Sequence, residues 1–179
     1  MDILPHEVIT VLKDYVIFKP KSKNKLQEAT DLWCIDKEKA LKQYGHISNW
    51  DTSLITDMSY LFQNKKDFND NINNWDVSNM TNMSSMFENA SSFNQDISLW
   101  NVSNVVFMQN MFSKASLFNQ DISQWNVSKV TTMWSMFYAA YSFNQDISKW
   151  NITNVDDMDC MFLAAHSFHK KNAPWYYFY

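Results

Sequence analysis

The chain has 179 residues, a net charge of −4 at pH 7 and a pI near 5.5. Its 15 Lys/Arg residues are all lysines, so it lacks the arginine fork that proteins use to grip phosphates and guanine. Charge and missing arginine together argue against a general attraction to nucleic acid or to anionic membranes. No apolar run approaches the roughly 20 residues that a membrane-spanning helix needs, so we expect no membrane span.

The start of the chain and its cysteines bear on the compartment. Residues 1–7 lack a basic stretch followed by an apolar core and a cleavage site, so we expect no signal peptide. Two cysteines, Cys34 and Cys160, cannot build a disulfide framework and are expected to be reduced thiols in a non-oxidising compartment. An intracellular or virion setting is therefore favoured over a secreted one.

Residues 1–45 lack the periodicity of the rest, and we predict that they form an N-terminal helical cap. Apolar residues share one helical face over 4–16, and they recur at helical spacing between 26 and 44. Gly45 is well placed to end the last helix. The opening Leu-Pro-His-Glu-Val at residues 4–8 is similar to the start of an F-box, which docks a ubiquitin-ligase adaptor. The alternative is an ordinary helix start with proline in the first turn.

A strict period of 25 residues governs the second predicted domain, residues 46–179. Tryptophan recurs at this step, at Trp50, Trp75, Trp100, Trp125, Trp150 and Trp175. Isoleucine (from Ile47), methionine (from Met58) and two phenylalanine series (from Phe62 and Phe68) repeat five times each in the same register. Since a constant period gives each unit the same path of chain, the pattern predicts a tandem-repeat solenoid.

Each unit predicts a short strand, a turn, a short helix and a second turn. Trp100 and Val102 alternate with period 2, as in a strand. Met108, Met111 and Phe112 follow the i, i+3, i+4 spacing of a helical face. We therefore expect an α/β repeat solenoid, a leucine-rich-repeat-like right-handed stack of about five coils, with a parallel sheet on one face.

The pattern decays at the C-terminal end. Residues 170–174 replace the usual Asn-Gln-Asp-Ile-Ser stretch, Trp175 stays in register, and residues 176–179 are all aromatic. This end predicts either an aromatic C-terminal cap that closes the last coil or a surface for self-association, because an uncapped stack exposes apolar surface and strand edges.

The unit at residues 93–105 reads Phe-Asn-Gln-Asp-Ile-Ser-Leu-Trp-Asn-Val-Ser-Asn-Val and closes with Met111 and Phe112. It resembles the BspA-type leucine-rich-repeat surface proteins, whose mycoplasma-lipoprotein-type repeats also occur in large DNA viruses. The resemblance covers residues 47–175. It implies a solenoid used for adhesion or protein binding, with no enzymatic activity, no cofactor and no catalytic residue to carry over. The chain departs from the family in lacking a signal peptide and a lipid-attachment cysteine, which puts a cell-surface role in doubt.

Polar residues beside the predicted strand are the candidate partner-binding residues. They recur in three successive coils: Ser98, Asn101, Ser103, Ser123, Asn126, Ser128, Ser148, Asn151 and Thr153. On a sheet they would form a hydrogen-bonding face, interrupted by the variable positions Leu99, Gln124 and Lys149. The alternatives are that this face contacts a partner or that it simply stays hydrated.

Metal and catalytic sites have weaker support. Asp96, Asp121 and Asp146 would stack as a ladder that either binds calcium or caps local backbone N–H groups. Cys160 lies near two histidines, but the set lacks a fourth ligand and matches no zinc-finger spacing. No nucleophilic triad is visible, so we expect no metal, no cofactor and no enzyme.

The sequence therefore predicts a non-catalytic protein–protein interaction or adhesion module that binds a protein partner. The alternative is a structural component of a virion or surface assembly, joined through the ends of the solenoid.

Overall fold

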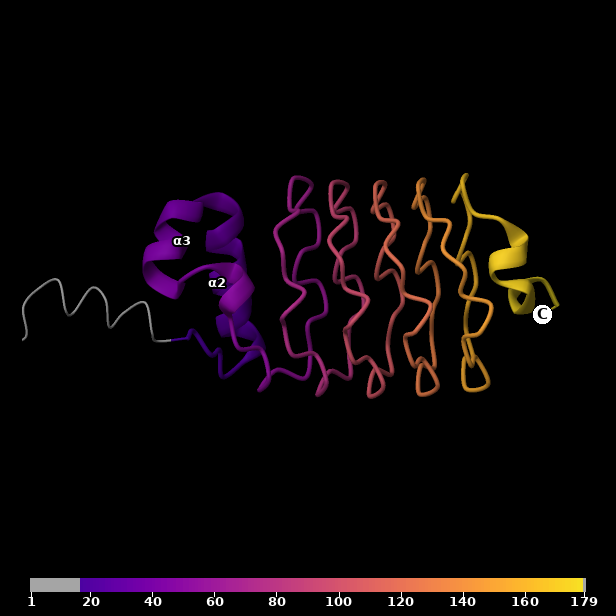
Figure 1. Ribbon diagram of the computed structural model, residues 1–179, viewed down its shortest axis with the longest axis horizontal. Coiled ribbons are helices and arrows are strands. Elements are labelled where there is room, and N and C mark those ends of the chain that lie inside the picture. Colours follow the sequence, from indigo (N-terminus) through magenta and orange to yellow (C-terminus); the bar gives the residue numbers. More distant parts are fainter. Residues whose placement is uncertain (1–16, 179) are drawn as a thin grey trace, which may run out of the picture.

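The structure is a computed structural model that describes residues 17–178. Two α-helices lie at one end, turn-rich coils stand side by side in a row, and short 3-10 helices lie at the other end (Figure 1). In chain order the helices are α2 (Lys23–Ile35), α3 (Lys37–Tyr44), η1 (Ile47–Asn49), η2 (Lys170–Asn172) and η3 (Pro174–Phe178). The helix predicted over 4–16 and the F-box-like residues fall outside the described part of the chain.

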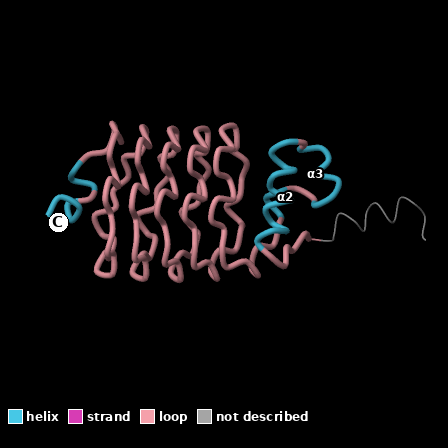
Figure 2. The backbone as a smooth tube through the Cα atoms, turned by 180° about the vertical axis from the view of Figure 1, so that it is seen from behind, coloured by secondary structure: helices cyan, strands magenta, loops and turns pink. Residues whose placement is uncertain are grey.

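The predicted α/β solenoid with a parallel sheet is wrong. Between η1 and η2 the described chain consists of loops and turns and contains no strand, as Figure 2 shows. Isolated parallel bridges join one residue per coil, from Asp57 through Asn82, Phe107 and Thr132 to Asp157. The segment predicted as a strand has turns on both sides of Trp100, whereas the segment predicted as a helix begins at these bridges.

Left-handed backbone at two positions in every coil explains why no helix forms there. In the third coil these are Asn110, with φ 57°, and Lys114, with φ 59°, and the equivalent residues of the other four coils also have positive φ. An α-helix needs consecutive right-handed residues, so each of these positions interrupts it. The chain forms successive turns instead, such as the one that the Met111 N–H closes onto the Met108 carbonyl at 3.2 Å. Such turns bring apolar side chains inward at a spacing close to that of a helix.

Alternate N–H groups in each of the first four coils donate to the following coil. In the third coil Met108 donates to the Thr132 carbonyl at 3.1 Å and Asn110 to the Trp134 carbonyl at 2.8 Å. Further along the same coil, the N–H groups of Met111 and Ser113 close turns onto Met108 and Asn110, so neighbouring coils are cross-linked although neither is an extended strand. We call these parts of the coils the ladder segments: residues 57–64, 82–89, 107–114, 132–139 and 157–164.

Columns of aromatic rings fill the interior of the stack. The rings of Phe62, Phe87 and Phe112 lie nearly parallel, with centroids 5.4 and 5.6 Å apart between successive coils. A second column, from Phe68 to Phe93 and onward, repeats at 6.0 Å beside the first. Within one coil the two rings also stack on each other, with centroids 3.9 Å apart for Phe62 and Phe68. Each ring therefore packs against a ring of its own coil and against rings of the neighbouring coils, and an isolated coil would expose the latter surfaces.

The repeated Phe-Asn-Gln-Asp sequence also has a structural role between coils. The Asn94 Oδ1 accepts the backbone N–H of Asn119 and the side-chain amide of Gln120, both at 2.9 Å. The pair formed by Asn119 and the next coil repeats this geometry. Each tryptophan adds a further link, since the Trp100 Nε1 donates to the Ile72 carbonyl of the preceding coil at 3.3 Å. Asparagine, glutamine and tryptophan thus recur because each bonds the neighbouring coil.

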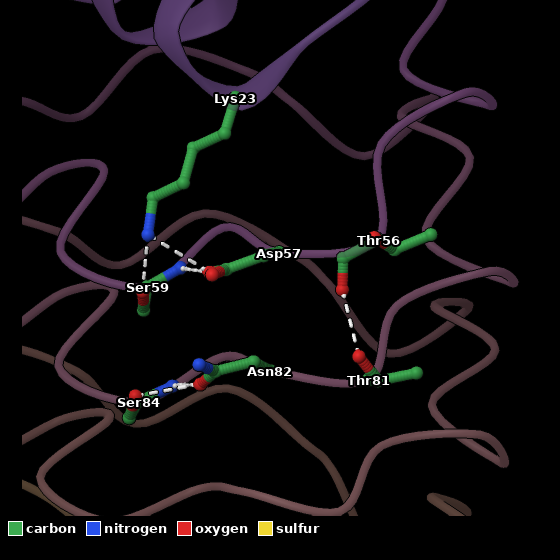
Figure 3. Close-up of polar contacts among 7 residues, drawn as sticks. All are labelled: Lys23, Thr56, Asp57, Ser59, Thr81, Asn82 and Ser84. Carbon is green, nitrogen blue, oxygen red and sulfur yellow. Dashed lines mark hydrogen bonds and ion pairs between the residues drawn. The ribbon is translucent and has the colours of Figure 1, made fainter.

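Helix α2 covers the first coil through one of its faces. Its residues 23, 27 and 31 share a face because they are four apart. The Lys23 Nζ donates to Asp57 at 2.9 Å and also bonds Ser59 (Figure 3), and the Gln27 Nε2 donates to the Leu61 carbonyl at 3.1 Å. Helix α3 follows directly and ends at Gly45, whose φ of 72° suits glycine.

At the far end of the stack, η3 lies against the last coil. The Tyr176 ring meets the Phe162 ring edge-on, with the centroids 5.0 Å apart. The Trp175 Nε1 donates to the Ile147 carbonyl at 3.2 Å, which continues the tryptophan pattern of the earlier coils. This aromatic end therefore covers part of the last ring layer.

Candidate functional site

The nine residues predicted to bind a partner lie in turns and not on a sheet face. We call residues 96–104 and their equivalents 121–129 and 146–154 the turn edge. There the Asn101 Oδ1 accepts the backbone N–H of Ser103 at 3.2 Å and its hydroxyl at 2.7 Å. Asn151 holds Thr153 in the same way, whereas Asn126 accepts only the backbone N–H of Ser128. These side chains occupy equivalent turns of successive coils, and part of their hydrogen-bonding capacity is used within their own turns.

The aspartate ladder of the turn edge is also bound to local backbone. The Oδ1 atoms of Asp96, Asp121 and Asp146 accept the N–H groups of Ser98, Ser123 and Ser148 at 2.9, 2.9 and 3.0 Å. Side-chain and backbone hydrogen bonds from the serine lower the pKa of Asp96 and of Asp146 below the ordinary value. Within residues 17–178, no group of three or more His, Cys, Asp or Glu side chains is arranged to hold a metal ion.

A shallow depression of about 180 Å³ opens on the turn edge between two coils. It is lined by Asp121, Ser123, Gln124, Gln145, Asp146 and Lys149. Gln124 and Lys149 occupy the variable position of the repeat, where Leu99 stands 88% exposed in the coil before. Three of the predicted or variable positions therefore meet in one polar hollow.

The ladder segments carry a second candidate surface, which the sequence reasoning missed. We call it the variable face, made of the bridge position and the position two residues later in each coil. The bridge column runs Asp57, Asn82, Phe107, Thr132, Asp157, and the second column runs Ser59, Ser84, Gln109, Trp134, Asp159. Phe107 is 42% exposed and Trp134 is 43% exposed, in adjacent coils. The signal that could have found this face is its lack of repetition inside an otherwise strict repeat.

At its α2 end the variable face holds a partly exposed ion pair. The Lys23 ammonium contacts Asp57, and the N–H of Ser59 donates to the Asp57 carboxylate at 2.7 Å (Figure 3). Partial burial acts to raise the pKa of Asp57, but the hydrogen bonds from Ser59 and Lys23 outweigh it and leave the pKa below its ordinary value. In the next coil Asn82 takes the place of the aspartate and accepts from Ser84 instead.

The cysteines and the C-terminal histidines do not converge. Cys34 is half-buried on α2, and burial raises the pKa of its thiol to about 11. Cys160 is exposed on the last ladder segment. His166 stacks on Tyr141, with the ring centroids 5.4 Å apart, on neighbouring coils. The arrangement therefore provides surfaces for contact rather than a cluster of reactive groups.

None of the helices described here has the length and apolar character needed to cross a bilayer.

Comparison with known proteins identifies a family for the chain. Neither the curated proteins nor the solved structures contain a counterpart that matches the chain. A family described as "Mycoplasma protein of unknown function, DUF285" matches residues 33–133 and 100–177. The two matches overlap and together span α3, all five ladder segments and most of η3. On this coverage, the chain belongs to the mycoplasma-type repeat family DUF285.

Proposed function

We propose that the chain is a non-catalytic protein-binding module that contacts its partner through the variable face. The observation that carries the proposal is the exposure of Phe107 and Trp134 on adjacent coils. Most positions around them hold the same residue type in successive coils, whereas these two positions do not. Aromatic side chains are enriched at the centres of protein interfaces because they bury large areas at small entropic cost. The cross-linked ladder supports them on a backbone that needs no rearrangement to bind.

The family membership is consistent with this proposal without specifying a partner. The finer resemblance to BspA-type leucine-rich-repeat surface proteins extends it to adhesion. The nine turn-edge residues remain a second candidate surface. We rank that surface lower because its asparagine and serine side chains already bond each other.

A matched pair of variants tests the variable face. The wild-type chain would be chemically cross-linked in an extract of the cells from which it comes. Its complexes would be compared with those of Phe107→Ser/Trp134→Ser and of Leu99→Ser/Leu117→Ser. The control pair removes two side chains that are 88% and 55% exposed outside the variable face. We expect the first pair to lose the complex and the control pair to keep it, with both variants still folded under the assay conditions. Equal retention by the two variants would contradict the proposal.

A second candidate function is that of a structural component of a virion or surface assembly, in which copies join through the ends of the stack. The aromatic residues of η3 favour it, since Tyr177 is 42% exposed at that end. Light scattering coupled to size-exclusion chromatography separates the two candidates. An oligomer that resists dilution supports the assembly component, whereas a monomer at all concentrations supports the binding module.

A further inference from the structure

The N–H groups that link one ladder segment to the next coil lack this partner in the fifth coil. In each of the first four coils, the first two ladder N–H groups donate to the next coil; in the fourth, Met133 donates to the Asp157 carbonyl at 2.7 Å and Ser135 to the Asp159 carbonyl at 2.9 Å. The equivalent N–H groups of the fifth coil belong to Met158 and Cys160. Among residues 17–178 neither has an acceptor. Two donors in the register of a further coil therefore face outward.

The side chains at this edge repeat a site that is occupied at the other end. Asp157 and Asp159 stand four repeats after Asp57 and Ser59, the pair that holds the Lys23 ammonium in Figure 3. None of the ion pairs formed within the described chain involves Asp157 or Asp159. Both carboxylates are exposed, and they lie in the same ladder segment as the two outward N–H groups.

We infer that this open edge, formed by Met158, Cys160, Asp157 and Asp159, binds an extended segment of a protein partner that carries a lysine or arginine. The segment supplies backbone carbonyls to the two N–H groups, as a further coil would, and its basic side chain lies over the two carboxylates as Lys23 lies over Asp57 and Ser59. The backbone hydrogen bonds position the segment on the edge, and the two carboxylates select a segment that carries a basic side chain.

A second copy of the chain stacked in line does not fit this edge. Joining the last coil of one copy to the first coil of another requires the first coil's carbonyls, and α2 already covers that side through Lys23 and Gln27, whose Nε2 bonds the Leu61 carbonyl. The Tyr176 ring covers Phe162, so the binding segment pairs with the start of the ladder segment and not with its end.

The test uses the full chain, isotopically labelled for NMR, and a synthetic peptide of residues 81–89 that carries Asn82→Lys. This peptide has the ladder sequence of the second coil, with a lysine at the bridge position. We expect the amide resonances of Met158 and Cys160 to shift on titration, while those of Met133 and Ser135, which already have acceptors, stay in place. A matched Asn82→Glu peptide should bind about tenfold more weakly or not at all.

A double variant of the protein provides the second arm. Asp157→Asn/Asp159→Ser gives the last coil the side chains that the second coil already uses at Asn82 and Ser84, so the fold should be kept. Its affinity for the lysine peptide should fall about two- to fivefold. The control Asp121→Asn/Asp146→Asn makes the same change of charge on the turn edge and should bind as wild type.

Several outcomes would overturn the inference. The first is equal affinity of Asp157→Asn/Asp159→Ser and of the control variant for the lysine peptide. The second is amide shifts confined to residues other than Met158 and Cys160. The third is a lysine peptide that does not bind at all. Shifts of the Met158 and Cys160 amides that follow protein concentration without peptide would assign the edge to a second copy instead. Asp157 and Asp159 belong to both the variable face and the open edge, but Phe107 and Trp134 belong only to the variable face. Loss of the partner complex in Phe107→Ser/Trp134→Ser and loss of peptide binding in Asp157→Asn/Asp159→Ser are therefore separate results, and either can occur without the other.

Discussion

At the scale of single residues, left-handed backbone at positions that are not glycine fixes the path of the chain. Lys114 and Ala139 have φ of 59° and 51°, a conformation in which glycine is the least strained residue. The chain has only one glycine, Gly45. The strain at these positions is tolerated because the N–H of each residue bonds a neighbouring coil, at 2.7 Å for Lys114 and 2.9 Å for Ala139.

Asp51 gives a prediction at this scale. Its carboxylate pairs with the Lys19 ammonium at 2.7 Å and accepts the Ser53 N–H at 3.0 Å, and these contacts lower its pKa to about 2. An unfolded aspartate titrates near pH ~3.9, so the pair stabilises the fold above that pH and the stabilisation is lost as pH falls toward 2.

Urea unfolding of wild type and Asp51→Asn from pH 7 to pH 2 measures this effect. We expect the variant to be less stable at pH 7 and the difference to close between pH ~4 and ~2. Asp67→Asn, which alters an exposed carboxylate, serves as the control and should track wild type. A stability gap that does not change with pH would show that the ion pair is not its source.

At the scale of the repeated element, amide side chains link the coils where a sheet would use backbone alone. Asn119 accepts both the backbone N–H of Asn144 and the side-chain amide of Gln145 at 2.9 Å. Asn126 lies in the same coil but serves only its own turn, through the Ser128 N–H. The two asparagines look alike in the sequence and differ in what they support.

We therefore expect Asn119→Ala to cost about 1–3 kcal/mol of unfolding free energy, because it leaves the Asn144 N–H and the Gln145 amide without their acceptor. Asn126→Ala should cost less, about 0.5–1 kcal/mol, since one local bond is lost. Denaturant unfolding of both variants gives the comparison. Equal losses would mean that the inter-coil bond adds nothing beyond a local cap.

At the scale of the whole molecule, ring columns, ladder bonds and amide links run through every coil, so the coils should unfold together. Trp100 lies in the middle of the stack, is only 4% exposed and bonds the Ile72 carbonyl. Trp100→Ala should lower the unfolding free energy by roughly 3–5 kcal/mol. Its neighbour Leu99, at 88% exposed, is the matched control, and Leu99→Ala should change stability by less than about 0.5 kcal/mol. An unchanged thermal melt for Trp100→Ala would contradict the core position of the tryptophan column.

The sequence by itself determined the repeat and its contents. A fixed step of 25 residues requires every unit to follow the same path, which is why the tryptophan and phenylalanine columns lie where their spacing places them. The Asn-x-Ser turn-edge residues could likewise be named from the sequence, because their repetition marks them as equivalent in every coil.

Only the tertiary structure decided which local conformation fills each repeat. Met108, Met111 and Phe112 have the spacing of a helix, but the same spacing serves turns whose left-handed residues send alternate N–H groups to the next coil. The choice depends on a bond to a residue 24 positions away, which no local pattern contains. For the same reason the variable face emerges only when the coils are stacked, since it takes two residues from each coil. The open edge lies within the fifth coil, but only the bonds between the earlier coils show which of its N–H groups lack an acceptor.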